Sequence, residues 1–174
     1  MVRAARGRGH QLRAGVAAGT GAWLLLLHAD ARVGGAALAE AEGAMARPEV
    51  QYAAWPLAID GPGPWLRWIE RGAALRWRLF GLAYGDQGLL LRRSLYEAAG
   101  GFPETAIMED VELVRRLRRY APMHRFHHPI VADGRRWQRE GAVRSSIRNV
   151  TLLLLHLGGV PADRLARWYR PEPR

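Results

Sequence analysis

Two adjacent acids, Glu109 and Asp110, stand directly before the amphipathic run VELVRRLRR. Acids in the first turn of a helix are stabilised by the exposed N–H groups and the helix dipole, by about 0.3–1 kcal/mol each. The same field keeps a carboxylate ionised, and a general base must be ionised to accept a proton from a hydroxyl group. The segment therefore predicts a helix start, a catalytic base or both, and its spacing leaves these interpretations open.

A third carboxylate, Asp30, follows the apolar run 22–27. A continuous apolar run between a glycine and a polar tip is typical of a parallel strand that is buried on both faces. Open α/β sheets bind ligands at the carboxyl ends of such strands, and a carboxylate there can hold a hard cation such as Mg²⁺ together with phosphate oxygens. The alternative interpretation of Asp30 is a cap for the turn that follows.

Two further groups of polar side chains come late in the chain. Arg135, Arg136 and Trp137 follow the expected strand within 125–132 on a loop, where the arginines could reach a site and the tryptophan could stack or pack. A solvated basic turn is the alternative. The neighbouring histidines match no known spacing of metal ligands, so we interpret them as surface or core residues: His124, His127 and His128.

The composition indicates one folded domain with an anionic partner. The 174 residues are enough for one core, and 49% of them are hydrophobic. The net charge of +10 comes from arginine alone, because the sequence contains no lysine. Guanidinium groups bind phosphate in a two-pronged geometry, so the candidate partners are a nucleotide diphosphate, a phospholipid surface or a nucleic acid. The absence of cysteine excludes disulfides and thiolate zinc sites.

Hydrophobic periodicity predicts the alternating helices and strands that would position these side chains. The expected strands lie at 22–27, 50–59, 88–91 and within 125–132, and the expected helices at 11–18, 35–46, 65–80, 94–99, 111–119, 142–157 and from 161 to 169. This order indicates a three-layer α/β domain. Apolar residues of the 65–80 helix share one helical face and are predicted to pack: Trp65, Trp68, Ile69, Leu75 and Leu79.

Three features bear on location and partners. No apolar run approaches the roughly 20 residues that a membrane-spanning helix needs. The basic and then apolar N-terminus has an alternative interpretation as a secretory signal cleaved after Ala31. The apolar face of 145–157, beside Arg144 and Arg148, could lie on a bilayer surface. No nucleic-acid motif accompanies the basic N-terminus, so a nucleic acid is not the favoured partner.

Five segments, taken in order, resemble glycosyltransferase family 2 enzymes with the GT-A fold, in particular the bacterial subgroup of radical-SAM/selenodomain-associated transferases. The resemblance covers nearly the whole chain. The segments are GRGHQLRAGVAAGTGAWLLLLHADAR at 7–32, YGDQGLLLRRSLYEAAGGFPE at 84–104, MEDVELVRRLRR at 108–119, GRRW at 134–137 and LGGVPADRLARWYRP at 157–171. They are similar, respectively, to the family's metal strand, its GGF loop, its "ED" helix, the end of its QxxRW motif and the subgroup's C-terminal signature.

The resemblance implies a site for a nucleotide-diphospho-sugar donor. Asp30 would bind the divalent cation, Mg²⁺ or Mn²⁺, that bridges the diphosphate. Asp110 would be the base that takes the proton of an acceptor hydroxyl during attack on the anomeric carbon from the face opposite the diphosphate, which would invert the configuration. The other implied site residues are Arg8, Gln11 and Gly15 on the nucleotide side, Gly85, Asp86 and Gln87 in the sugar or acceptor pocket, Glu109 as an orienting residue, and Arg135, Arg136 and Trp137 over the substrate.

The chain departs from the family pattern in three places. Family members begin with a strand similar to SVIIPxLNE and with further nucleotide-binding strands, so the resemblance implies that this chain is the C-terminal two thirds of the GT-A domain, with 142–174 as a helical extension. His28 occupies the first acidic position of the metal motif, which leaves Asp30 as its one carboxylate. Asp133 stands where the wider family has the glutamine of QxxRW.

These observations lead us to expect a metal-dependent, inverting glycosyltransferase that is cytoplasmic and can contact the inner face of the membrane. The sequence does not identify the sugar, the nucleotide or the acceptor. The alternative from another functional class is a non-catalytic, arginine-rich protein that binds a membrane surface or a nucleic acid and is derived from a truncated glycosyltransferase.

Overall fold

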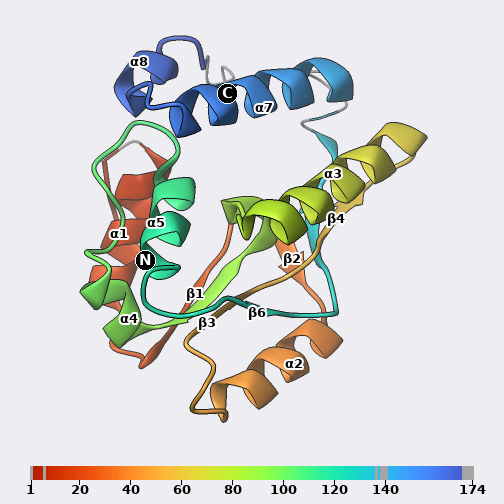
Figure 1. Cartoon of the computed structure of the whole chain (residues 1–174). Coiled ribbons are helices and arrows are strands. Elements are labelled where there is room, and N and C mark those ends of the chain that lie inside the picture. The colour runs from red at the N-terminus through yellow and green to blue at the C-terminus, as the bar shows by residue number, and fades with distance from the viewer. Residues whose placement is uncertain (1, 6, 136, 138–140, 170–174) are drawn as a thin grey trace.

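Two mixed β-sheets and the helices around them make up the computed structural model, which describes residues 2–5, 7–135, 137 and 141–169 (Figure 1). The chain therefore has a mixed α/β fold. The helices are α1 (Arg8–Ala18), α2 (Gly35–Met45), α3 (Pro64–Phe80), α4 (Arg93–Ala98), α5 (Glu109–Leu117), α7 (Ala142–Leu157) and α8 (Ala162–Ala166), with a 3₁₀ turn η1 (Gly85–Gln87). Their positions confirm the predicted helices to within a few residues at each end.

The larger sheet has the order β1-β5-β3-β6, with β5 antiparallel to both of its neighbours and β3 parallel to β6. Its strands are β1 (Trp23–Leu26), β5 (Leu89–Arg92), β3 (Tyr52–Ala54) and β6 (His124–Arg125). The expectation of a parallel strand buried on both faces at 22–27 is wrong. The strand pairs antiparallel to β5, and Leu25 is 42% exposed between the buried Leu24 and Leu26.

The smaller sheet has the order β2-β7-β4, with β7 antiparallel to β2 and parallel to β4. Its strands are β2 (Ala31–Val33), β7 (Ile130–Asp133) and β4 (Leu57–Asp60). The single strand expected at 50–59 is thus two strands in different sheets. They separate at Trp55-Pro56, where proline has no N–H for a ladder and its carbonyl instead accepts a bond from Ile130.

Helices cover both faces of the larger sheet. Leu89 and Leu91 of β5 pack towards α1, α4 and α5, whereas Leu90 between them packs towards α2. Alternate side chains of a strand point to opposite faces, so one leucine-rich strand contributes to both apolar layers. The helices on both faces of the larger sheet are compatible with the α/β domain expected from the order of the elements.

Helix α3 packs through a different face from the one predicted. Leu66, Ala73 and Trp77 are buried, whereas Trp65 is 59% and Trp68 is 63% exposed. Ile69 is half-buried against the smaller sheet, but Leu75 and Leu79 are also exposed. The predicted packing of this set is therefore wrong for all of its members except Ile69. The helix carries apolar residues on two faces, and helical periodicity alone cannot tell which of them meets a sheet.

Glycine at position 88 is required by the junction of η1 and β5, and this requirement can be tested. Its φ is +62°, and a Cβ there would lie 2.6 Å from Cδ1 of Ile130 and 3.0 Å from Cδ2 of Leu27. We expect Gly88→Ala to lower the free energy of unfolding by about 2–3 kcal/mol in urea denaturation, through backbone strain and overpacking.

The control is Gly43→Ala in α2, where a Cβ would meet nothing within 4 Å. Alanine should raise the free energy of unfolding there by about 0.5–1 kcal/mol, because it restricts the unfolded chain. Equal stabilities of the two variants would contradict the assigned packing at position 88.

Candidate functional site

A cavity of about 530 Å³ lies where the N-terminal ends of α1 and α5 approach α7 and α8. It collects residues from segments that are far apart in the sequence. Its lining includes Arg8, His28, Asp30, Tyr84, Asp86, Glu109, Asp110, Trp137, Asn149, Leu152 and Tyr169. Six of the predicted site residues are therefore brought to one place: Arg8, Asp30, Asp86, Glu109, Asp110 and Trp137.

Asp110 is held at the cavity by backbone hydrogen bonds at both of its oxygens. Gly85 N–H donates to Oδ2 at 2.7 Å, and Val111 N–H donates to Oδ1 at 2.9 Å. Burial disfavours the charged form, but the guanidinium of Arg8, 3.4 Å from Oδ2, and these two bonds outweigh it and hold the pKa of Asp110 below its usual value. The side chain is thus an ionised carboxylate in a largely enclosed setting.

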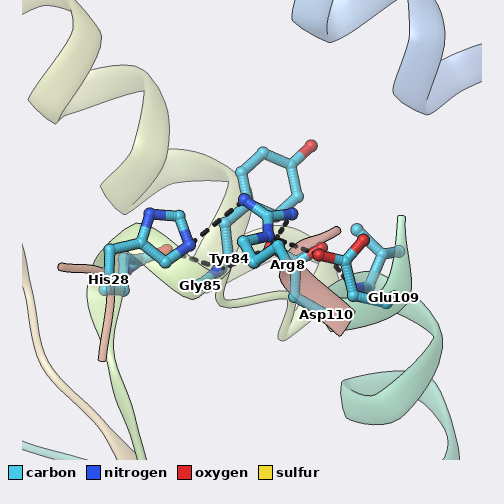
Figure 2. A network of polar contacts seen from close by, with 8 residues as sticks. Arg8, His28, Tyr84, Gly85, Glu109 and Asp110 are labelled. Carbon is cyan, nitrogen blue, oxygen red and sulfur yellow. Dashed lines mark hydrogen bonds and ion pairs between the residues drawn. The ribbon is translucent and has the colours of Figure 1, made fainter. Parts of the chain in front are cut away.

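Arg8 connects both acids to His28, as Figure 2 shows. Its Nε donates to Oε1 of Glu109, whose side chain is only 3% exposed. Its Nη1 lies 3.1 Å from Nε2 of His28. Because a guanidinium can only donate, this ring nitrogen must accept, and the histidine carries its proton on Nδ1. One arginine from the start of α1 therefore pairs with both acids at the start of α5.

His28 and Asp86 are both biased towards their neutral forms. Burial and then the charge of Arg8 lower the pKa of His28, and burial raises the pKa of Asp86. Oδ1 of Asp86 is enclosed and has no hydrogen-bond partner among the described residues. Glycine precedes this aspartate because a Cβ at Gly85 would lie 2.5 Å from Nε2 of His28 and 3.1 Å from Oδ2 of Asp110.

Gln87 does not line the cavity and instead supports its floor. It is fully buried, and its Oε1 accepts bonds from Arg76 Nη2 at 2.8 Å and from the Tyr84 N–H at 3.2 Å. Its Nε2 donates to the carbonyl of Trp55 at 3.2 Å. These bonds tie η1 to the larger sheet and explain why glutamine is needed at this position.

Three other predicted site residues lie away from the cavity lining. Gln11 and Gly15 are exposed on α1 beyond its first turn. Arg135 is exposed, and its Nε donates to Oδ2 of Asp133 at 2.6 Å. Arg136 falls outside the described residues, so its predicted role stays a prediction.

Asp30 lies in the turn between β1 and β2, exposed and facing the cavity. Within the described part of the chain, no group of three or more histidine, aspartate or glutamate side chains is arranged to hold a metal ion. Mg²⁺ commonly takes one or two protein carboxylates and completes its shell with water and substrate phosphate. Asp30 offers one carboxylate, so a cation bound here would complete its shell with water or with oxygens of a ligand.

Aromatic and C-terminal residues of the cavity were missed by sequence reasoning. Tyr84 packs its ring against the guanidinium of Arg76, 3.4 Å from the ring centroid, and burial raises the pKa of its hydroxyl to about 12. Asn149 of α7 and Tyr169 after α8 come from the opposite wall. Tyr84 and Tyr169 both lie within the quoted motifs, but only the folded chain shows that they face the same space.

Comparison with models of protein families, with curated proteins and with solved structures finds no match for this chain. What the chain does must therefore be inferred from its own residues. The cavity brings together an ionised carboxylate, a histidine biased towards its neutral form, an arginine and an exposed aspartate, and convergent polar groups of this kind are typical of a ligand-binding site.

The contribution of Arg8 to stability can be measured with Arg8→Gln. This change leaves Glu109 and Asp110 buried without their countercharge, so we expect the free energy of unfolding to fall by about 1–3 kcal/mol near neutral pH. The lowered pKa of Asp110 means that its ion pair stabilises the fold above the pKa of the unfolded carboxyl group and ceases to do so as the pH falls through the lower, folded value. The loss should therefore shrink in acid.

Urea denaturation across this pH range tests the expectation, with Arg13→Gln as the control on the same helix. Arg13 pairs with Glu104 at 2.7 Å, but the glutamate side chain is 80% exposed, so this pair should contribute less than about 1 kcal/mol. A loss that is the same for both variants, or one that does not depend on pH, would contradict the network described here.

Proposed function

We propose that this chain is a glycosyltransferase that moves a sugar from a nucleotide-diphospho-sugar to an acceptor hydroxyl, with a divalent cation and with inversion. The observation that carries the proposal is the convergence of Arg8, Asp30 and Asp110 on one cavity. These residues come from two of the five motifs that resemble family 2 enzymes, Arg8 and Asp30 from 7–32 and Asp110 from 108–119. The three layers around the larger sheet are compatible with the GT-A fold that the resemblance implies.

Asp110 supplies the base in this proposal. Its carboxylate accepts the proton of the acceptor hydroxyl while the hydroxyl oxygen forms a bond to the anomeric carbon. The bond from that carbon to the diphosphate breaks on the opposite face, and the electron pair leaves with the diphosphate. A single displacement of this kind inverts the configuration, and the hydrogen bonds from Gly85 and Val111 keep the carboxylate aimed during it.

In this proposal, binding of the donor changes the pKa of Asp110 through Arg8. A diphosphate attracts a guanidinium strongly and can bind it through two parallel hydrogen bonds. If the diphosphate draws Arg8 away from Asp110, the carboxylate loses the charge that most depresses its pKa. Its pKa then rises towards the range in which a carboxylate is an effective base.

Asp30 and the cavity walls would hold the donor. The cation bound by Asp30 would neutralise charge that develops on the leaving diphosphate. Trp137 and Leu152 form apolar parts of the wall and help to exclude water from the reacting atoms. Because α7 and Tyr169 supply part of this wall, the described part of 142–174 is assigned to the same domain as the catalytic residues.

The alternative of a non-catalytic, arginine-rich binding protein fits the cavity less well. Burying two acids beside a neutral histidine costs stability, which a surface binding function does not require. The alternative expects salt-dependent binding to a polyanion and no affinity for nucleotide-sugars in the presence of Mg²⁺ or Mn²⁺. A cytoplasmic location follows from the proposed donor and belongs to the same proposal.

Asp110→Asn tests the assignment of the base. Asparagine keeps the shape but cannot accept the proton, so transfer should fall by about 10²–10⁴-fold while donor binding changes little. The assay is release of nucleoside diphosphate from a panel of nucleotide-sugars and acceptors, and binding is measured by calorimetry. Asp163→Asn, at the exposed first turn of α8, is the control. Unchanged turnover in the Asp110 variant would remove this residue as the base.

Asp30→Ala tests the metal ligand without requiring turnover. Binding of uridine or guanosine diphosphate should be tighter with Mg²⁺ or Mn²⁺ than with a chelator, and the alanine variant should lose this difference. Asp60→Ala is the matched control, because Asp60 is an exposed aspartate that pairs with Arg32 and lies outside the cavity lining. Retention of the metal effect in the Asp30 variant would refute the assignment.

A further inference from the structure

Helix α3 exposes an apolar stripe that the core does not use. Trp65, Trp68, Leu75 and Leu79, which we call the α3 outer face, are exposed by 59%, 63%, 56% and 65%. Their spacing places them on one side of the helix, opposite the buried side that packs on the smaller sheet. Two exposed tryptophans and two exposed leucines in one stripe mark an interaction surface.

Arginines border this stripe. The guanidinium of Arg71 lies 5.5 Å from the centroid of the Trp68 ring, and Arg78 is exposed in the last turn. Glu70, the one acid in the helix sequence, bonds to the backbone of Ile59 at 2.6 Å and pairs with Arg67 at 3.0 Å. The α3 outer face is therefore apolar and basic together.

Helix α7 presents a second face of the same kind. Val143, Ile147, Val150 and Leu154, the α7 outer face, are all exposed, whereas Leu152 on the other side of the helix is buried at the cavity. Arg144 is exposed beside them. Helices α3 and α7 contact each other, and Figure 1 shows α7 at the end of the molecule opposite α2, with α3 between them.

The chemistry of the two faces favours a bilayer over other occupants. Tryptophan concentrates at the boundary between headgroups and acyl chains, and arginine is attracted to anionic headgroups. A nucleic acid would attract the arginines but would give the leucines and valines no apolar partner. The net charge of +10 adds attraction towards an anionic surface. No helix in the described part of the chain is long and apolar enough to cross a membrane.

We propose that the α3 and α7 outer faces bind the surface of an anionic phospholipid bilayer. Trp65 and Trp68 insert at headgroup depth, and the neighbouring arginines bind lipid phosphates. Because the inner side of α7 lines the cavity through Asn149 and Leu152, bilayer binding would hold the cavity at the membrane surface. This inference stands on different residues from the proposed transferase chemistry.

Cosedimentation with vesicles tests the apolar part of the proposal. The chain should bind vesicles of phosphatidylcholine with phosphatidylglycerol, should bind vesicles of phosphatidylcholine alone weakly, and should be released by salt. Trp65→Ser with Trp68→Ser should weaken binding by about tenfold or more, as should Ile147→Ser with Leu154→Ser. Leu38→Ser, at an exposed leucine of α2, should leave binding unchanged. All of the substituted side chains are exposed, so the variants should fold, and circular dichroism checks that they do.

Charge reversal tests whether the arginines act locally. Arg71→Glu with Arg78→Glu should abolish binding, whereas Arg3→Glu with Arg119→Glu, which changes the net charge equally at exposed arginines elsewhere, should weaken it much less. Equal losses in both variants would show attraction by net charge alone and overturn the proposed surface. Absence of vesicle binding, together with self-association in light scattering that the tryptophan variant abolishes, would instead identify the face as an interface between copies of the chain.

Discussion

The pairing of Arg8 with two acids at the start of α5 is the interaction on which the rest of the site depends. Glu109 and Asp110 are both buried, and two adjacent carboxylates removed from water repel each other and lose hydration. The guanidinium from α1 compensates this cost and fixes the first turn of α5 relative to α1. His28 and Gly85 contact the same network, His28 through Arg8 and Gly85 through Asp110.

The ionisable groups of the cavity have pKa values that are shifted in two opposite senses, towards the charged form in one case and towards neutral forms in the others. Asp110 is kept ionised by donors on several sides, whereas Asp86 and His28, which lie in the same space, are biased towards neutrality by burial. Groups whose pKa values are pushed apart by their surroundings are typical of sites that transfer protons. Helix α7 lies between the cavity and the molecular surface. One side of it faces the cavity, and the other side carries exposed apolar residues.

Local patterns in the sequence predicted where helices would form but not how strands would pair. The apolar run that ends before Asp30 was expected in a parallel sheet, yet its strand pairs antiparallel to one that follows it by more than sixty residues. Trp65 and Trp68 of α3 were expected inside and are exposed, because a helix with two apolar faces can pack through either of them. A single segment of sequence specifies neither the partner of a strand nor the face through which such a helix packs.

Sequence alone determined the kinds of chemistry available: an arginine-rich chain without cysteine, an acidic pair at the start of a helix, and an aspartate shortly after an apolar run. Tertiary structure alone decided which of these groups meet. It placed Arg8 against Glu109 and Asp110, buried Gln87 as a support, and left Gln11 and Gly15 in solvent. The physical reason is that burial and charge pairing depend on neighbours about a hundred residues away, which no local pattern can specify.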